Sequence, residues 1–196
     1  MTCAFQEPLA LTMSTKYKFN NPDGIYFVSF AVVGWLDVFT RQVYRDLFLE
    51  SLVYCQKEKG LKIHAWIIMS NHIHLIISRS GTQKIEDIMR DLKKYSAFRI
   101  LKEIKENSGE SRKDWMLYLF SKAGQANSNN KVYQFWRQDN HPVELDFHSN
   151  IFEQKLNYIH ENPVEAGIVK KASDYLYSSA IDYEDGKGLI EIDVLH

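Results

Sequence analysis

The chain has 196 residues, a formal net charge of −1, and hydrophobic and charged fractions of 45% and 25%. This length and composition predict one domain with a core of ordinary size, and the balanced charge excludes a molecule-wide basic field for binding nucleic acid. Cys3 and Cys55 are too few for a disulfide framework and favour a reducing, cytoplasmic setting. No apolar run is long enough to span a membrane, and the N-terminus lacks the pattern of a signal peptide.

The first elements follow an N-terminal extension. Residues 1–13 are expected to be disordered, and residues 14–196 to form one domain. A β-rich run at 25–33 predicts the first strand. Thr40 is expected to cap a helix that stops at Gly60. Helical spacing predicts that its inward side carries Val43, Leu47, Ser51 and Tyr54, widened by Phe48, Leu52 and Cys55.

The middle of the chain predicts a hairpin followed by a long helix. Strands at 62–69 and 72–78 are joined by the turn Ser70-Asn71. Thr82 is then expected to cap a helix that ends near Lys105. Its predicted inward residues are Ile85, Ile88, Met89, Leu92 and Ser96.

A polar, loop-rich stretch at 107–130, with a short apolar piece inside it, follows the long helix. The elements predicted beyond it are a strand at 132–137, a helix at 149–161, a helical turn opened by Pro163, and a late strand at 188–194. The resulting order of strand, helix, strand, strand, helix, strand is the split βαβ, or ferredoxin-like, pattern. It predicts an α+β fold with an antiparallel sheet and helices mainly on one face.

His72 and His74 are separated by one residue on a predicted strand. Alternate residues of a strand point to the same face, so the two imidazoles are expected to lie side by side while Ile73, Leu75 and Ile77 face a core. Two imidazoles on a rigid strand can hold one metal ion. Such a pair is more often structural when it stands alone, so a third ligand and a reacting group are needed.

The predicted helix at 149–161 offers candidates for both the reacting group and the third ligand. Its apolar stripe is Phe152, Leu156 and Ile159, and Tyr158 lies far round the cylinder from this stripe, among polar residues. A tyrosine there is either a nucleophile or simply exposed, and Lys155, one turn earlier, could stabilise a phenolate or a phosphate.

Asn162 has two competing roles. Before Pro163, and with a glutamate three residues on, it is a good helix N-cap. It also lies one turn beyond Tyr158, from where its amide oxygen could complete a metal site with the two histidines. The residue pattern leaves both roles open.

Four segments together resemble the REP-associated tyrosine transposases of the single-tyrosine HUH superfamily. They are Asn-His-Ile-His-Leu-Ile at 71–76, Phe-Trp-Arg at 135–137, Tyr-Ile-His-Glu-Asn-Pro-Val-Glu-Ala-Gly-Ile-Val at 158–169, and Tyr-Leu-Tyr-Ser-Ser at 175–179. The resemblance runs from about residue 16 to about residue 183, which is most of the chain.

The resemblance implies a ferredoxin-like catalytic domain that cleaves and joins single-stranded DNA at hairpin or palindromic sites. It implies that His72 and His74 bind a divalent metal, Mg²⁺ or Mn²⁺, with Asn162 as the third ligand. It implies that Tyr158 is the nucleophile and forms a 5′-phosphotyrosine link. Such an enzyme acts on the nucleoid and needs no nucleotide cofactor, and the sequence has no Gly-rich phosphate loop. Whether Tyr158 serves its own histidines or those of a homodimer partner is left open.

Local clusters, rather than net charge, are the candidates for binding DNA. Lys93, Lys94 and Arg99 lie in a basic stretch of the second helix, which is either a phosphate-binding patch or a solvated face. Trp136 could stack on a base and Arg137 could pair with a phosphate, although a core tryptophan is the commoner arrangement.

Other functions fit the sequence less well. A domesticated DNA-binding protein of the same fold that no longer cuts is the main alternative, and the filled chemical positions argue against it. Barrel metallohydrolases need about 250 residues and more ligands than this chain supplies. An RNA-binding module on the same sheet would need strand aromatics in a pattern that the sequence lacks.

Overall fold

The structure, a computed structural model, describes residues 19–127, 132–138 and 142–195. The extension predicted at 1–13 lies outside the described residues. The sheet has the strand order β2-β3-β1-β4, and all three neighbouring pairs are antiparallel. This is the split βαβ arrangement, so the predicted fold class is confirmed. The strands are β1 Ile25–Ala31, β2 Leu61–Ile68, β3 His72–Arg79 and β4 Val143–Leu145.

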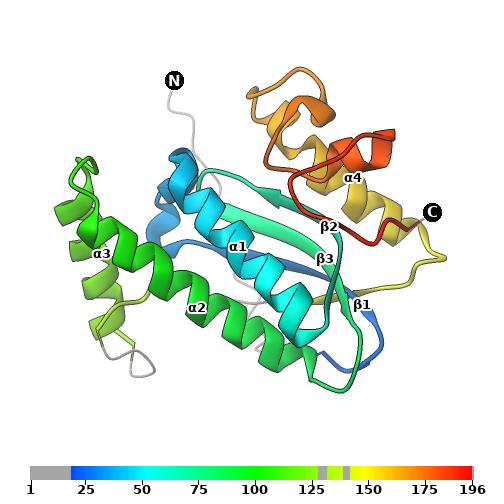
Figure 1. The fold of residues 1–196 in the computed structure, drawn as a ribbon, viewed down its shortest axis with the longest axis horizontal. Helices are drawn as coiled ribbons and strands as arrows, with labels where there is room; N and C mark the ends of the chain where they lie inside the picture. The colour runs from blue at the N-terminus through cyan, green and yellow to red at the C-terminus, as the bar shows by residue number, and fades with distance from the viewer. Residues whose placement is uncertain (1–18, 128–131, 139–141, 196) are drawn as a thin grey trace, which may run out of the picture.

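Helices lie on both faces of this sheet. The helices α1 (Gln42–Lys59) and α2 (Ile85–Glu106) pack side by side on one face (Figure 1). On the other face lies α4 (Asn150–Glu165), next to the C-terminal segment. The remaining helix, α3 (Lys113–Gln125), packs against α2 at one end of the molecule. None of the helices among the described residues combines the length and apolar character needed to cross a bilayer.

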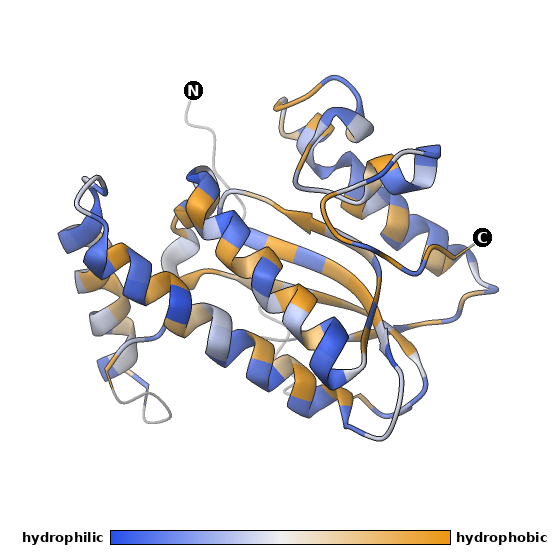
Figure 2. Ribbon diagram, in the orientation of Figure 1, coloured by the Kyte–Doolittle hydropathy of each residue, from blue (hydrophilic) through white to orange (hydrophobic). Residues whose placement is uncertain are grey.

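Strand alternation divides the buried residues into two cores. Odd-numbered residues of β3, such as Ile73 and Leu75, pack toward α1 and α2. Ile76, on the opposite side of the same strand, packs with Phe27 and with Ile159 of α4. The strands are therefore largely hydrophobic, whereas the helices alternate between hydrophobic and hydrophilic residues (Figure 2). Because β3 is buried on both faces, any polar side chain on it needs a specific partner.

The helix α1 differs from the prediction in its N-cap residue and in one residue of its buried face. Arg41, not Thr40, occupies the N-cap position, and the Thr40 hydroxyl instead donates to the Asp37 carbonyl at 3.0 Å. Tyr54 is 49% exposed, because the buried stripe is rotated toward Tyr44 and Phe48. The predicted end is confirmed: Gly60 adopts a left-handed conformation with φ 67°, and its N–H donates to the Cys55 carbonyl.

The predicted inward side of α2 is confirmed, but its cap is not. All five predicted inward residues are buried: Ile85, Ile88, Met89, Leu92 and Ser96. The N-cap position is Lys84 rather than Thr82.

Two predictions for the middle of the chain are wrong. The segment within 107–130 that was expected to be loop contains α3, whose inward residues Met116, Phe120 and Gly124 recur every four residues. Residues 132–137 form no strand among the described residues; Trp136 makes only an isolated bridge to Val32. The fourth strand is β4 instead, which pairs with the start of β1.

The C-terminal elements also differ from the prediction. The α4 helix continues through Pro163, so no separate helical turn begins there. Residues 188–194 form no strand, although the Asp193 N–H donates to the Ile63 carbonyl at 2.8 Å. Residues 177–179 likewise bond to Trp66 and Ile68. The C-terminal segment thus satisfies the open edge of β2 without becoming a regular strand.

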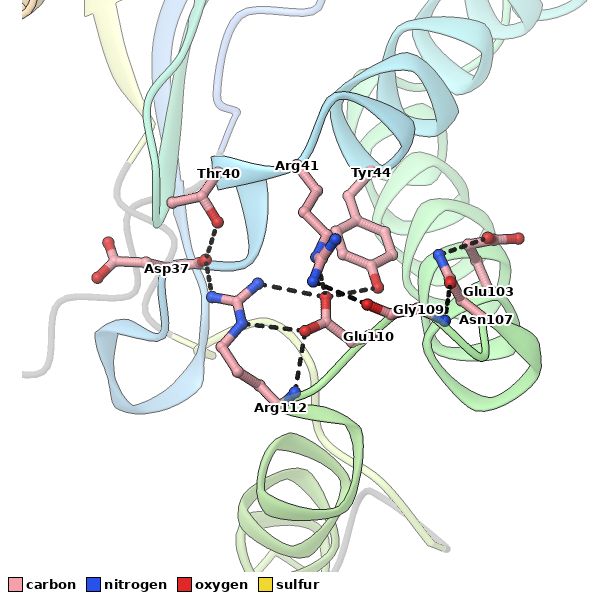
Figure 3. A network of polar contacts seen from close by, with 9 residues as sticks. All are labelled: Asp37, Thr40, Arg41, Tyr44, Glu103, Asn107, Gly109, Glu110 and Arg112. Atoms are coloured by element: carbon pink, nitrogen blue, oxygen red, sulfur yellow. Dashed lines mark hydrogen bonds and ion pairs between the residues drawn. The ribbon is translucent and has the colours of Figure 1, made fainter.

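A buried carboxylate ties the connection after α2 to the start of α1 (Figure 3). Glu110 is paired with Arg41 at 2.7 Å and with Arg112 at 3.1 Å, and the Tyr44 hydroxyl donates to it at 3.0 Å. Burial alone would raise the pKa of Glu110, but the hydrogen bonds from Arg112 and Tyr44 outweigh it and lower the pKa to about 2. The network positions the segment that precedes α1, which carries Asp37.

Candidate functional site

The two histidines of β3 share the face of the sheet that α4 covers. The centroids of the His72 and His74 rings are 4.8 Å apart. Ile73, between them, is buried in the opposite core. The predicted side-by-side arrangement is therefore present in the structure.

Neighbouring side chains fix the orientation of both rings. His72 Nδ1 donates to Asn71 Oδ1 at 2.7 Å, because that oxygen can only accept, so His72 Nε2 keeps its lone pair. His74 Nδ1 lies 2.7 Å from Ser29 Oγ, on the residue paired with it across β1. His74 Nε2 is buried and has no hydrogen-bond partner. Both rings can therefore present Nε2 to a ligand.

Burial keeps these imidazoles neutral near pH 7. It lowers the pKa of His74 to about 3, with smaller contributions from His72 and Lys155. It also lowers the pKa of His72, against an opposing hydrogen bond with Asn162. Neutral imidazole is the form that binds a metal ion.

Tyr158 approaches the histidines from α4. Its ring centroid lies 5.1 Å from that of His74 and 6.1 Å from that of Phe27, and the residue is 44% exposed. Lys155 lies one turn earlier, with Nζ 5.6 Å from the centroid of the Tyr158 ring. The Ser149 hydroxyl caps the helix by accepting from the Ile151 N–H. The tyrosine is thus accessible and is held on a rigid element opposite the histidines.

Asn162 lies inside α4, which excludes the N-cap role, one of the two roles that the sequence leaves open. Its Nδ2 donates to the Tyr158 carbonyl at 2.7 Å, one turn back along the helix. With the nitrogen committed to that bond, the amide oxygen is the atom left to face His72, where it favours the protonated imidazole and so raises the pKa of that ring.

These donors fit a divalent metal ion. The two imidazole Nε2 atoms and the Asn162 amide oxygen come from two elements that face each other. The unpartnered, buried Nε2 of His74 is an atom that a metal would satisfy. No cluster of three His, Cys, Asp or Glu exists among the described residues, so a third ligand to such an ion would have to be the amide or come from outside these residue types.

The basic residues predicted on α2 lie across the sheet from the histidines. Arg99 pairs with Glu50 of α1 at 2.6 Å, and Lys94 is exposed. Lys93 reaches the end of the sheet, where Nζ donates to the Arg137 carbonyl at 3.1 Å. Of the predicted DNA-binding residues, the structure brings only Lys155 and Arg137 toward the histidine face.

Trp136 is not a stacking residue. It is 6% exposed, and its Nε1 donates to the Lys93 carbonyl at 3.1 Å. The exposed aromatic at this end of the sheet is Trp35, which sequence reasoning missed. Ser29 was missed as well, although a lone serine among apolar strand residues, at the position facing His74, is a signal that could have been used.

The fold and the site place a histidine pair on a split βαβ sheet against a tyrosine on a helix. The family described as Transposase IS200 like matches residues 36–135, just over half of the chain, and the chain belongs to this family. The matched segment contains both histidines and ends before α4.

One solved structure supports the fold. The REP-associated tyrosine transposase bound to a REP hairpin is similar with a TM-score of 0.62 and 18% identity, over 94% of this chain and 92% of the other. A Deinococcus radiodurans R1 protein described as a transposase aligns with a TM-score of 0.42 and 16% identity, over 67% of this chain and 85% of the other. No curated protein sequence matches the chain.

Proposed function

We propose that this protein cuts and rejoins single-stranded DNA at hairpin or palindromic sites, with Tyr158 as the nucleophile. One observation carries the proposal: the Tyr158 ring lies 5.1 Å from the His74 ring on the face where both histidines present their rings. Membership in a transposase family supports it, and so does the hairpin to which the structurally similar REP-associated transposase is bound.

The reaction follows from phosphate chemistry. The Tyr158 hydroxyl oxygen attacks the scissile phosphorus, the bond from phosphorus to the 3′ oxygen breaks, and the 3′ oxygen takes up a proton. The products are a 5′-phosphotyrosine link and a free 3′-hydroxyl. Attack by another 3′-hydroxyl reverses the step and joins strands. Since the number of phosphodiester bonds is conserved, no nucleotide cofactor is required.

His72, His74 and Asn162 would hold the metal, Mg²⁺ or Mn²⁺. When bound, the metal would polarise the phosphate and offset its charge. Lys155 stands beside Tyr158, where its ammonium would stabilise a phenolate or the phosphate. Ser29 and Asn71 hold the rings in the orientation that this site needs.

We further propose that Tyr158 serves the histidines of its own chain, which is supported by the 5.1 Å between the Tyr158 and His74 ring centroids. A homodimer remains a prediction about assembly rather than a requirement of the chemistry. The proposed location is the cytoplasm, on the nucleoid when the protein acts.

Tyr158→Phe tests the proposal, because it removes the attacking oxygen alone. A 3′-labelled single strand that contains a hairpin should yield labelled DNA covalently attached to the parent protein, and none with Tyr158→Phe. DNA binding and Mn²⁺ binding should persist in that variant. The matched control is Tyr118→Phe, on α3 and 63% exposed, which should cut normally.

Two outcomes would contradict the proposal. Undiminished cleavage by Tyr158→Phe would rule out the nucleophile, and Tyr175 and Tyr177 would be tested next. Binding without any cleavage by the parent protein would instead favour the domesticated, non-cleaving alternative.

A further inference from the structure

Trp35 ends a row of rings that begins at the proposed nucleophile. Tyr158 is followed by His74 at 5.1 Å, then His72 at 4.8 Å, then Trp35 at 6.1 Å, each distance joining ring centroids. Trp35 meets His72 edge to face, at 77°, and is 53% exposed. A large apolar ring is thus open to solvent beside the histidine pair.

The backbone at Trp35 is held in an unfavourable conformation. Its φ is +54°, in the left-handed region that bulky residues avoid. Two hydrogen bonds hold the turn: the Trp35 N–H donates to the Val32 carbonyl at 3.0 Å, and Asn71 Nδ2 donates to the Trp35 carbonyl at 3.3 Å. Folding gains little by straining the backbone to expose a tryptophan. Strain of this kind gathers at functional sites.

Arg137 supplies a cation next to the ring. Its guanidinium carbon lies 5.2 Å from the Trp35 ring centroid. The Arg137 N–H donates to the Ala31 carbonyl at 2.8 Å, which fixes the residue to the end of β1. An exposed aromatic face beside an arginine is the combination that binds single-stranded nucleic acid, where the ring stacks on a base and the cation contacts the backbone.

We propose that Trp35 is the stacking platform for an unpaired base of the DNA strand that enters the active site. The inference rests on the proposed function, which brings a single strand to the histidines. Trp35 here binds and positions the strand and takes no part in the chemistry. Arg137 is the phosphate contact beside it.

The test measures binding in the Tyr158→Phe protein, so that cleavage does not interfere. The two probes are a DNA hairpin with an oligothymidine extension and the same hairpin with an abasic extension of equal length. Trp35→Ala should weaken binding of the oligothymidine probe about tenfold. It should leave the abasic probe unchanged, because that probe has no bases to stack. The slope of affinity against salt should not change, because no phosphate contact is lost.

Trp115→Ala is the matched control, since Trp115 is 54% exposed on α3, and it should bind both probes normally. Trp35→Gly should bind like Trp35→Ala without a lower melting temperature, because glycine accepts a positive φ; a fall in melting temperature would show that the ring is structural and overturn the proposal.

The proposal would also be overturned if Trp35→Ala weakened binding of the oligothymidine probe by less than about twofold, or weakened binding of both probes equally. Binding that does not depend on Trp35 refutes the stacking platform alone. Failure of the protein to bind either probe refutes the proposed function as well.

Discussion

The Asn162 side chain donates its hydrogen bond within α4, to the Tyr158 carbonyl, and it caps no helix. An N-cap needs a backbone that is only half helical, which a residue three positions before the end of a continuous helix does not have. The side chain is thereby free to serve the site. At the scale of single residues, the role of a side chain follows from the element that carries it.

Asn162→Ala should separate metal binding from stability. We expect the free energy of unfolding to change by no more than about 0.5 kcal/mol, because alanine is the better helix former and no cap is lost. Mn²⁺ affinity, measured by calorimetry, should fall at least about tenfold, the lower end of what loss of an orienting partner causes. Asn157→Ala, an exposed position on the same helix, is the control and should change neither. A drop in stability of about 1 kcal/mol with unchanged Mn²⁺ affinity would show instead that Asn162 is a structural residue.

At the scale of elements, the segment before α1 depends on a contact that is remote in sequence. The Arg112 guanidinium bonds the Asp37 carbonyl at 2.9 Å, and Glu110 binds Arg41 and Arg112 together (Figure 3). Asp37 in turn accepts from Asn71 Nδ2 at 3.1 Å, next to His72. A buried ion pair network at the end of α2 therefore supports the strand turn that carries the site.

Glu110→Gln should destabilise the fold by about 2 kcal/mol at pH 7, because charge-assisted hydrogen bonds are replaced by weaker ones. The folded pKa of Glu110 is depressed to about 2, so its stabilisation is complete above the unfolded pKa of about 4.3 and is lost as the pH falls toward 2. Denaturant titrations at several pH values should show the two proteins converging in acid. Glu106→Gln, at an exposed site on α2, is the control for the loss of a carboxylate and should leave the free energy of unfolding at pH 7 unchanged. A constant difference between pH 7 and pH 3 would contradict the assigned pKa.

At the scale of the whole molecule, the sheet separates two basic surfaces. Lys155 and Arg137 lie toward the histidines, whereas Lys94 and Arg99 belong to the helix layer behind them. The net charge of −1 provides no long-range field to compensate for a lost local contact. The effect of lysine substitutions on DNA affinity should therefore show which of the two surfaces the DNA strand follows.

Lys155→Ala should weaken binding of single-stranded DNA. It should also reduce the slope of log affinity against log salt by about one, as expected for the loss of one phosphate contact. The double variant Lys93→Ala, Lys94→Ala, which tests the patch predicted from the sequence, should change the slope less. Fluorescence anisotropy at several salt concentrations measures both. The reverse order would place the DNA path over α2.

The sequence by itself determined the strands β1, β2 and β3, the long helices α1 and α2, the face shared by His72 and His74, and the placement of Tyr158 away from the apolar stripe. Each of these follows from local periodicity, which repeats within one element. Only the tertiary structure decided that β4 replaces the strand predicted at 132–137, that Asn162 faces His72, and that Trp35 and Ser29 join the site. These depend on which segments meet across the sheet, and contacts between residues distant in the chain leave no periodic pattern in the sequence.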